Sequence, residues 1–432
     1  MRRRISERLL KWKSSHRRQP LLVYGARQVG KTYVINEFGR NNYENVIYVN
    51  LETNLTVAAD FNRDISPEHI VNCLEIFYKQ KIVPGKTLVF FDEIQSCERA
   101  LTSLKYFCEN APEYHIAGAG SLLGVALNRE KFSFPVGKVD LLHLYPLDLE
   151  EFLWAVDQEA LVNEIRSCYM ADAPLSPMLH EVALQLYKEY LIVGGMPAVV
   201  KEYCKSQRLI DAVDIQSLIV DTYIADMAKY ATPSETTKIM AAFQSIPTQL
   251  AKENRKFQYK IAQRGGSASI FGASIDWLCA AGLVVKCNKV EHGYMPLAAH
   301  QDFSSFKLYM GDVGLLTLKS GMAAHNILTN IETHNTFLGA IVENYVADQL
   351  RVHWNELYYW GSAHTAEIDF VIQAQEKIIP VEVKSSTHIR SRSLSVYKEK
   401  YAPPYAIRIS AKNFGFENHI KSVPLYAVFC IA

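Results

Sequence analysis

One short segment constrains the fold more than any other feature of this sequence. A run of apolar residues, Leu21 to Tyr24, comes before it, and a helix-like stretch, Tyr33 to Phe38, follows it. The segment itself reads Gly25-Ala26-Arg27-Gln28-Val29-Gly30-Lys31-Thr32. It fits the pattern G-x-x-x-x-G-K-[ST], in which backbone N–H groups curl around phosphate oxygens at a helix N-terminus. A strand, such a loop and a helix in this order predict an α/β domain with a parallel sheet.

The residue types of the segment assign roles within it. All of its residues are candidates for nucleotide binding, because their backbone lines the phosphates. Lys31 is expected to reach the β and γ phosphates and to act in catalysis, and the Thr32 hydroxyl is expected to ligate Mg²⁺. The predicted ligands are therefore ATP or GTP together with Mg²⁺.

An acidic pair supplies the second half of this predicted site. Leu88 to Phe91 is a run of four apolar residues, which is typical of a strand buried on both faces, and Asp92 and Glu93 follow it. Acidic residues at the C-terminal end of such a strand lie where open α/β sheets bind ligands. We expect Asp92 to hold Mg²⁺ and Glu93 to orient or activate the attacking water. The alternative is that the pair only begins a surface loop.

The alternation of strand-like and helix-like segments continues through the first third of the chain. Short apolar runs alternate with helix-like stretches, at Leu21 to Tyr24, Val46 to Asn50, Leu88 to Phe91, His115 to Gly118 and Leu141 to Leu147. This order predicts parallel strands with helices between them. Ser121 ends the fourth strand region and is a candidate for contact with the γ-phosphate, although a plain strand-to-helix turn explains it nearly as well.

Composition sets broad limits on the rest. A chain of 432 residues predicts two or three domains, and a net charge of +1 means that any nucleic-acid surface must come from local basic clusters. The eight cysteines form no C-x-x-C pair and show no Cys/His spacing that suits zinc, so we expect reduced thiols in a cytoplasmic protein. The sequence contains no uninterrupted apolar run of about 18 residues, so a membrane span is not expected.

The middle of the chain has helical spacing and then the order of a winged helix. Residues 153–230 read as helical, and two helices and two strands are expected at Ser245 to Asn254, Ser267 to Ala281, Leu283 to Lys289 and Ser305 to Met310. Basic residues surround Tyr259 before the second helix, at Lys252, Arg255, Lys256, Lys260 and Arg264. They favour phosphate contact. The second helix carries no Lys or Arg, so protein docking or a spacing role stays an equal alternative.

A set of carboxylates marks the C-terminal part. A helix is expected at Phe337 to Val352, and strands are expected at Leu357 to Trp360, Glu367 to Ile372 and Ile378 to Val383. Because side chains alternate along a strand, Glu382 and Lys384 project from one face. With Asp369 on the neighbouring strand and Glu343 on the helix, three carboxylates would bind one or two Mg²⁺ ions, and Lys384 would position or deprotonate water.

A basic run follows this set and is a candidate for contact with a phosphate backbone. It contains Lys384, His388, Arg390, Arg392, Lys398 and Lys400, interleaved with Tyr397 and Tyr401. The alternative for the whole region is an ion-paired edge of a domain that keeps a fold but no chemistry. Helix Glu343, Asp369 and then Glu-x-Lys resemble the restriction-endonuclease-like core, in which Asp369, Glu382 and Lys384 would be catalytic.

Taken together, the motifs resemble a widespread prokaryotic family that joins an AAA-type ATPase domain to a C-terminal domain of unknown function. The likeness rests on G-x-R-Q-V-G-K-T, Phe91 to Gln95, Gly120-Ser121, Tyr145 to Phe152, Gly194-Gly195-Met196-Pro197 and Gly339 to Asn344. The resemblance implies ATP rather than GTP. Family members commonly carry Gly-Arg where this chain has Gly137-Lys138, so an arginine finger there is in doubt.

These inferences give three expected domains: an AAA-type P-loop ATPase domain (1–165), a helical region with a winged helix (166–325) and a restriction-endonuclease-like domain (326–432). The leading hypothesis is a Mg²⁺-dependent ATPase whose nucleotide state controls a module that engages DNA or RNA, and whether this module is a nuclease is left open. The alternative is an ATP-switched scaffold or regulator that binds DNA, a protein partner or its own copies without cleavage. A small-molecule kinase fits the loop but leaves Glu93 unexplained.

Overall fold

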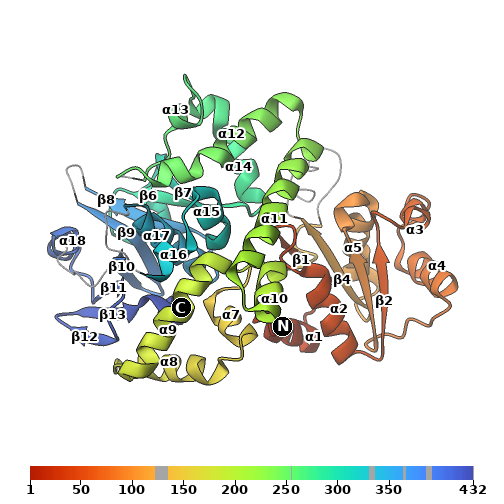
Figure 1. Ribbon diagram of the computed structural model, residues 1–432. Coiled ribbons are helices and arrows are strands. Elements are labelled where there is room, and N and C mark those ends of the chain that lie inside the picture. The colour runs from red at the N-terminus through yellow and green to blue at the C-terminus, as the bar shows by residue number, and fades with distance from the viewer. Residues whose placement is uncertain (122–134, 254, 330–335, 363–365, 386–391, 432) are drawn as a thin grey trace. The chain divides into compact units, whose positions relative to one another are not determined.

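The structure is a computed structural model, which describes residues 1–121, 135–253, 255–329, 336–362, 366–385 and 392–431 (Figure 1). The chain divides into two compact units. The first comprises Met1–Tyr145 with Ala280–Gly282, and the second comprises Pro146–Cys279 with Leu283–Ala432. Within the described residues, no helix is both long and apolar enough to cross a membrane.

The first unit is built on a five-stranded sheet in which every pair of neighbours is parallel. The strand order is β2-β3-β4-β1-β5. The strands are β1 (Leu21–Gly25), β2 (Asn45–Asn50), β3 (Thr87–Asp92), β4 (His115–Ser121) and β5 (Asp140–His143). All five expected strand regions are confirmed. β5 ends earlier than expected, before Pro146, which has no N–H to continue a ladder.

Helices cover both faces of this sheet. They are α1 (Ile5–Ser14), α2 (Lys31–Asn42), α3 (Leu55–Asp60), α4 (Pro67–Tyr78) and α5 (Glu98–Asn110), with a 3₁₀ turn at Ile94–Ser96. Alternate residues of β3 enter two separate cores: Leu88 and Phe90 pack with residues of α1 and α2, whereas Val89 and Phe91 pack with residues of α3, α4 and α5. The continuous apolar run of β3 is therefore explained by burial on both faces.

The second unit begins with helices, as the sequence predicts for residues 153–230. In chain order, the helices from residue 149 onward, including those that follow strands, are α7 (Leu149–Ala155), α8 (Glu159–Ala171), α9 (Pro177–Val193), α10 (Pro197–Ser206), α11 (Leu209–Tyr230), α12 (Pro233–Leu250), α13 (Tyr259–Ala262), α14 (Ala268–Ala280), α15 (Val313–Ser320), α16 (Ala324–Leu328), α17 (Thr336–Leu350) and α18 (Arg392–Tyr401). α12 starts well before the expected Ser245, because Thr232 and Glu235 form a capping box at its N-terminus.

The signature Gly194-Gly195 has a packing role in this unit. Gly194 ends α9 with a φ of 70°, which favours glycine. A Cβ on Gly195 would lie 1.9 Å from the backbone oxygen of Leu147. The N–H of Gly195 donates to Asp312 Oδ2 at 2.6 Å, and Asp312 Oδ1 accepts from the N-terminus of α15. Asp312 thus joins two distant segments, and burial raises the pKa of its carboxyl group.

An eight-stranded mixed sheet forms the rest of the second unit, in the order β12-β13-β11-β10-β9-β8-β6-β7. Its strands are β6 (Val284–Val290), β7 (Gln301–Met310), β8 (Leu357–Gly361), β9 (Glu367–Ala374), β10 (Lys377–Val383), β11 (Ala406–Ser410), β12 (Gly415–Glu417) and β13 (Ile420–Pro424). A short 3₁₀ segment, Leu425–Cys430, follows. The expected hairpin is confirmed, since β9 and β10 pair antiparallel.

This sheet differs from the expected domain organisation in one respect. The two strands assigned to the winged helix, β6 and β7, do not stand apart, because β6 pairs parallel with β8. One sheet therefore runs through the expected boundary between residues 325 and 326. Likewise, Pro146 already belongs to the second unit, whereas the sequence places the first boundary near residue 165.

Candidate nucleotide site and C-terminal carboxylates

The phosphate-loop motif connects β1 directly to α2, which confirms the strand–loop–helix context. Three of its residues have positive φ: Gly25 (152°), Gln28 (65°) and Gly30 (90°). Gly30 caps the N-terminus of α2 in the left-handed region, which a side chain would disfavour. A Cβ on Gly25 would lie 2.1 Å from the backbone oxygen of Leu144, so the glycine is also required by the chain that follows β5.

Lys31 lies folded over its own loop. Its Nζ donates to the carbonyl oxygens of Gly25 at 3.1 Å and of Ala26 at 2.8 Å, and the residue is 8% exposed. Burial lowers the pKa of Lys31 to about 8, although the carboxylates of Glu93 and Asp92 act in the opposite direction. Among the described residues, the direct partners of the ammonium are thus carbonyl dipoles, and phosphate oxygens would be stronger ones.

Asp92 connects the end of β3 to the loop. The Thr32 hydroxyl donates to Asp92 Oδ2 at 2.9 Å, and the Tyr48 hydroxyl of β2 donates to the same oxygen at 3.0 Å. Asp92 is 3% exposed. The two predicted Mg²⁺ ligands, Thr32 and Asp92, are therefore brought together. Tyr48 was not anticipated, since an aromatic residue in a strand carries no signal beyond strand propensity.

Glu93 follows with a φ of 48°, a left-handed conformation that is uncommon for a non-glycine residue and that clusters at functional sites. Its carboxylate accepts a hydrogen bond from the Gln95 side-chain amide. The other atom of that amide, Gln95 Oε1, lies 2.5 Å from where a Cβ on Gly120 would stand. Gly120 therefore leaves the space that lets Gln95 approach Glu93.

Ser121 ends β4, which lies between β1 and β3 in the sheet. The register pairs Ser121 with Gly25, the first residue of the phosphate loop. Ser121 Oγ and Gln95 Oε1 are buried without a hydrogen-bond partner among the described residues. Buried polar atoms are normally satisfied, so these two fit a site that receives polar groups of a ligand or its water.

Lys138, which stands where an arginine finger is in doubt, lies at the other edge of this sheet. It precedes β5, whose first residue, Asp140, pairs with Leu21 at the start of β1, whereas the phosphate loop follows the end of β1. Its Nζ lies 3.0 Å from Glu109 Oε1. Within its own unit, Lys138 is therefore directed away from the phosphate loop.

Of the C-terminal residues, the Glu-x-Lys pair is brought together. Lys384 Nζ lies 3.2 Å from Glu382 Oε1, and Arg408 Nε lies 3.7 Å from Glu382 Oε2. Glu382 is 2% exposed, and its Oε2 accepts no hydrogen bond from the described residues. Asp369 Oδ2 accepts a hydrogen bond from the backbone N–H of Val383 at 2.8 Å, between the two residues of the pair.

Glu343 has other partners. Its Oε1 lies 2.9 Å from Lys307 Nζ and accepts a hydrogen bond from the Tyr309 hydroxyl at 2.6 Å, and its Oε2 forms an ion pair with Arg255. Lys307 is fully buried and also lies 2.7 Å from Glu367 Oε1. Arg255, which the sequence assigned to phosphate contact, thus neutralises Glu343 together with Lys307.

The predicted C-terminal metal ligands do not form a compact group. Among the described residues, one set of at least three candidate ligands has all of its ligand atoms within 4.8 Å of one another, and it is not Glu343, Asp369 and Glu382. Sequence reasoning missed Lys307 and Glu367. The available signal for Glu367 was its spacing of two from Asp369, which places both on one face of β9.

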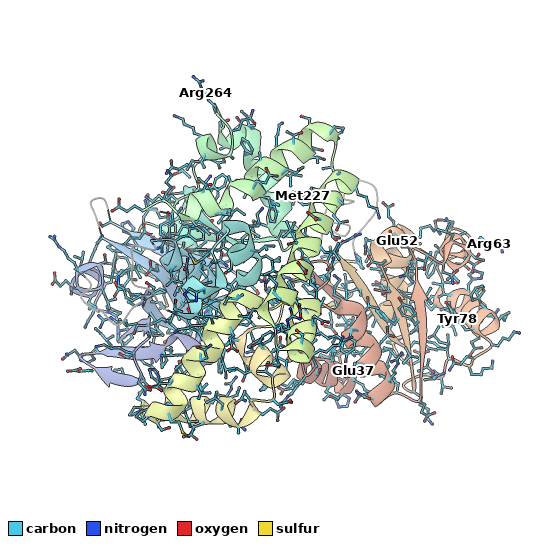
Figure 2. The ribbon with its side chains drawn as sticks, in the orientation of Figure 1. Glu37, Glu52, Arg63, Tyr78, Met227 and Arg264 are labelled. Carbon is cyan, nitrogen blue, oxygen red and sulfur yellow. The ribbon has the colours of Figure 1, made fainter. Side chains whose placement is uncertain are left out.

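The basic residues expected to hold phosphate have mixed environments. Lys252, Lys260 and Arg264 are exposed, and Arg264 projects from the segment between α13 and α14 (Figure 2). Lys398 donates to the carbonyl oxygen of Asn418, and Tyr397 is fully buried. Lys400 lies over the ring of Trp360, while His388 and Arg390 lie outside the described residues.

Three family models match successive parts of the chain, and none of them covers half of it. Residues 17–153 match the model described as an AAA domain. Residues 184–326 and 338–428 match two domains of unknown function, DUF8612 and DUF4143. The parallel sheet, the phosphate loop and the first of these matches define an AAA-type P-loop ATPase domain, a class that binds and hydrolyses nucleoside triphosphates, typically with Mg²⁺. The chemistry of the two later domains is not defined by their matches.

Solved structures resemble the chain only distantly. The Walker-type ATPase PABY2304 of Pyrococcus abyssi aligns with a TM-score of 0.45 and 13% identity, over 74% of this chain and 95% of that one. The Orc1 protein of Aeropyrum pernix in complex with DNA gives a TM-score of 0.28, 12% identity and coverage of 76% and 91%. A RuvB variant of Thermotoga maritima gives a TM-score of 0.29 and 14% identity, over 65% of this chain and 88% of that one. Likeness at this level supports no inference about function, and no curated protein matches the chain.

Proposed function

We propose that this chain is a Mg²⁺-dependent ATPase whose nucleotide state controls a C-terminal module that engages nucleic acid. The observation that carries the first part is the hydrogen bond of 2.9 Å between the Thr32 hydroxyl and Asp92. It joins the phosphate loop to the acidic end of β3, so that hydroxyl and carboxylate oxygens, the ligands that Mg²⁺ prefers, face one another. None of the eight cysteines forms a disulfide within the described residues, which fits a cytoplasmic location.

Each residue of the site has a task in this proposal. Mg²⁺ would neutralise charge on the phosphate oxygens when bound beside Thr32 and Asp92. Lys31 exchanges its two carbonyl partners for β and γ phosphate oxygens. Tyr48 holds Asp92 in place. Glu93, oriented by Gln95, accepts a proton from the attacking water.

The test compares ATP binding and turnover among three variants. Lys31→Ala removes the ammonium and is expected to abolish binding. Glu93→Gln keeps the size of the side chain but removes the base, so ATP should bind normally while turnover falls by about 10²- to 10⁴-fold. Glu113→Gln is the matched control. Glu113 is exposed and precedes β4, so it lies at the N-terminal ends of the strands, opposite the phosphate loop. Turnover of Glu93→Gln at the wild-type rate would show that Glu93 is not the base.

For the second unit, we propose nucleic-acid contact through the exposed Lys252, Lys260 and Arg264 beside a winged helix formed by α12 to α14, β6 and β7. Cleavage at a restriction-endonuclease-like site is supported by the buried Glu382 Oε2, which accepts no hydrogen bond from the described residues and fits a cation. Under this proposal Asp369 and Glu382 hold Mg²⁺, and Lys384 positions or deprotonates water.

A specific observation favours the second candidate function, an ATP-switched scaffold that binds without cutting. Glu343, the expected helix acid, is already neutralised by Lys307 and Arg255. A metal ion would have to displace these cations, which lowers its net gain. In the scaffold proposal, the second unit has the same fold and the same ion pairs but does not cleave nucleic acid.

The discriminating experiment incubates plasmid and single-stranded DNA with Mg²⁺ or Mn²⁺. Cleavage by wild type that disappears in Asp369→Ala and Lys384→Ala, but persists in the control Lys377→Ala at the exposed start of β10, supports the nuclease. Cleavage that all variants retain indicates a contaminant, and cleavage by none of them supports the scaffold. Stimulation of ATP turnover by DNA or RNA then measures whether the two units communicate.

A further inference from the structure

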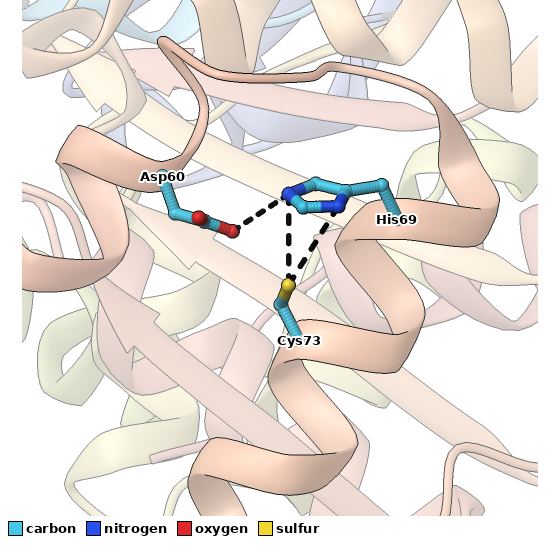
Figure 3. Close-up of side chains that lie close together, drawn as sticks. All are labelled: Asp60, His69 and Cys73. Carbon is cyan, nitrogen blue, oxygen red and sulfur yellow. Dashed lines mark hydrogen bonds and ion pairs between the residues drawn. The ribbon is translucent and has the colours of Figure 1, made fainter.

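A second cluster of metal-binding side chains lies in the first unit, outside the phosphate site. Asp60 is the last residue of α3, and His69 and Cys73 lie four residues apart on α4, so they share one face of that helix (Figure 3). His69 Nε2 lies 3.0 Å from Asp60 Oδ2 and 3.6 Å from Cys73 Sγ. The ligand atoms of all three residues lie within 4.8 Å of one another.

The separation between nitrogen and sulfur agrees with the corresponding edge of a tetrahedral zinc site, whereas the separation between nitrogen and oxygen is shorter. Zn–N bonds of about 2.05 Å and Zn–S bonds of about 2.3 Å at a tetrahedral angle give an N···S edge of about 3.6 Å, and Zn–O bonds give an N···O edge of about 3.4 Å. The observed N···S distance of 3.6 Å equals the first value. The observed N···O distance of 3.0 Å is shorter than the second, as expected for a direct hydrogen bond.

The geometry excludes a Cys–His–Asp nucleophile at this place. In such triads the nucleophile and the carboxylate contact different nitrogens of the imidazole ring. One nitrogen takes the proton of the nucleophile, and the carboxylate orients the ring through the other nitrogen. Here the closest nitrogen to both partners is the same Nε2.

We propose that Asp60, His69 and Cys73 bind one divalent transition-metal ion, Zn²⁺ in the first place, with water in the fourth position. Thiolate and imidazole ligands select such ions over Mg²⁺, which prefers oxygen. An ion can enter, since His69 and Asp60 have side chains that are 27% and 26% exposed.

Asp60 is already oriented for this role. Its Oδ1 lies 3.9 Å from the guanidinium of Arg63, which leaves Oδ2 for the cluster. Arg63 extends outward near α3, and its side chain is 80% exposed (Figure 2). The guanidinium therefore lies beside the carboxylate without filling the metal position.

The bound ion would link α3 to α4, because its ligands come from both helices. α3 has only 6 residues and is too short to be stable by itself, so its position depends on tertiary contacts. One of these is Val57, which packs in the core with residues of α4. The sequence showed no zinc spacing because the third ligand, Asp60, comes from a different helix than the His-x-x-x-Cys pair. This inference does not depend on ATP turnover.

The test titrates the full-length, metal-free protein with Co²⁺, a spectroscopic substitute for Zn²⁺, in excess Mg²⁺ to occupy oxygen-ligand sites. Wild type is expected to bind one equivalent, with a thiolate-to-cobalt charge-transfer band and the visible bands of a four-coordinate ion, and Zn²⁺ should displace it. Cys73→Ser should lose the charge-transfer band. Its affinity should fall by more than the roughly 10- to 100-fold that loss of an outer-shell partner costs. Cys108→Ser, at a half-buried cysteine of α5, should leave the spectrum unchanged.

Three outcomes would contradict the proposed metal site. A charge-transfer band that survives in Cys73→Ser, or no stoichiometric Co²⁺ binding by wild type, overturns the proposal. If Cys73→Ser does not fold, as judged by circular dichroism, Asp60→Asn replaces it, because the amide has the same size as the carboxylate. Asp60→Asn should keep the charge-transfer band but alter the visible bands and weaken binding. Unaltered visible bands and affinity in Asp60→Asn would refute the three-ligand site.

Discussion

The pH dependence of ATP binding follows from the environment of Lys31. In the ligand-free protein, burial lowers the pKa of this ammonium from 10.5 to about 8. A bound triphosphate places strong negative charge on it, which returns the pKa to 10.5 or above. Between these two values the complex binds more protons than the free protein. Affinity for ATP must therefore fall as the pH rises through this window.

The size of the effect can be calculated. With a pKa of about 8, Lys31 is protonated in about three-quarters of free molecules at pH 7.5 but in only about one in eleven at pH 9, whereas it stays protonated in the complex. The affinity should thus fall about eightfold, which is about 1.2 kcal/mol. At about pH 8.5, binding should take up about 0.75 of a proton.

Calorimetry measures both quantities. Titrations with a slowly hydrolysed ATP analogue and Mg²⁺ at about pH 7.5 and 9 give the affinities, and buffers of different ionisation enthalpy give the proton uptake. The lower limit avoids protonation of the terminal phosphate, whose pKa is about 6 to 7. Lys31→Arg is the control, since a guanidinium stays charged over this range and should remove the dependence. Equal wild-type affinities at the two values, without proton uptake, would refute the assigned state of Lys31.

Three further predictions concern single positions. Gly120→Ala places a Cβ 2.5 Å from the oxygen of a flexible glutamine side chain, so stability should change by less than about 1.5 kcal/mol while ATP turnover falls, as steady-state kinetics and urea unfolding will show. Gly195→Ala meets a backbone oxygen at 1.9 Å and should destabilise the second unit by about 3 kcal/mol or more, visible as an earlier thermal transition. Glu343→Ala removes one of the two carboxylates that contact the buried Lys307, as well as the ion-pair partner of Arg255, and should cost about 3 kcal/mol, whereas Glu343→Leu with Lys307→Met should recover part of it in the same urea experiment.

The sequence predicts the first unit well because its signals are local. The phosphate loop, the apolar run Leu88 to Phe91 and the acidic residues after it all lie within short segments whose spacing determines their geometry. Parallel strands then bring Thr32 and Asp92 together without further information, since both follow C-terminal ends of strands. What the pattern could not supply was Tyr48, which reaches Asp92 from the neighbouring strand.

The second unit is less predictable because its contacts are distant in sequence. No local pattern shows that β6 pairs with β8, about 70 residues further on, so the expected boundary at residue 325 falls within one sheet. The Gly194-Gly195 signature indicates a tight turn, but its partner Asp312 follows more than a hundred residues later. In the same way, Lys307 and Arg255 carried only the general expectation that basic residues face solvent or phosphate.

The two acidic sites differ in how their charge is compensated, and this difference bears on which of them binds a metal ion. Asp92 accepts hydrogen bonds from two neutral hydroxyls, which orient the carboxylate but leave its charge to attract a cation. Glu343 is held by two cations and a phenol, so its charge is already balanced within the protein. A cation at Glu343 would compete with Lys307 and Arg255 for this carboxylate, and Lys307 would keep Glu367, whereas Arg255 would lose its ion pair with Glu343, at a cost of several kcal/mol. Any metal chemistry in the second unit therefore has to rest on Asp369 and Glu382 without the helix acid, which makes the DNA-cleavage comparison a direct test of whether two carboxylates and Lys384 suffice.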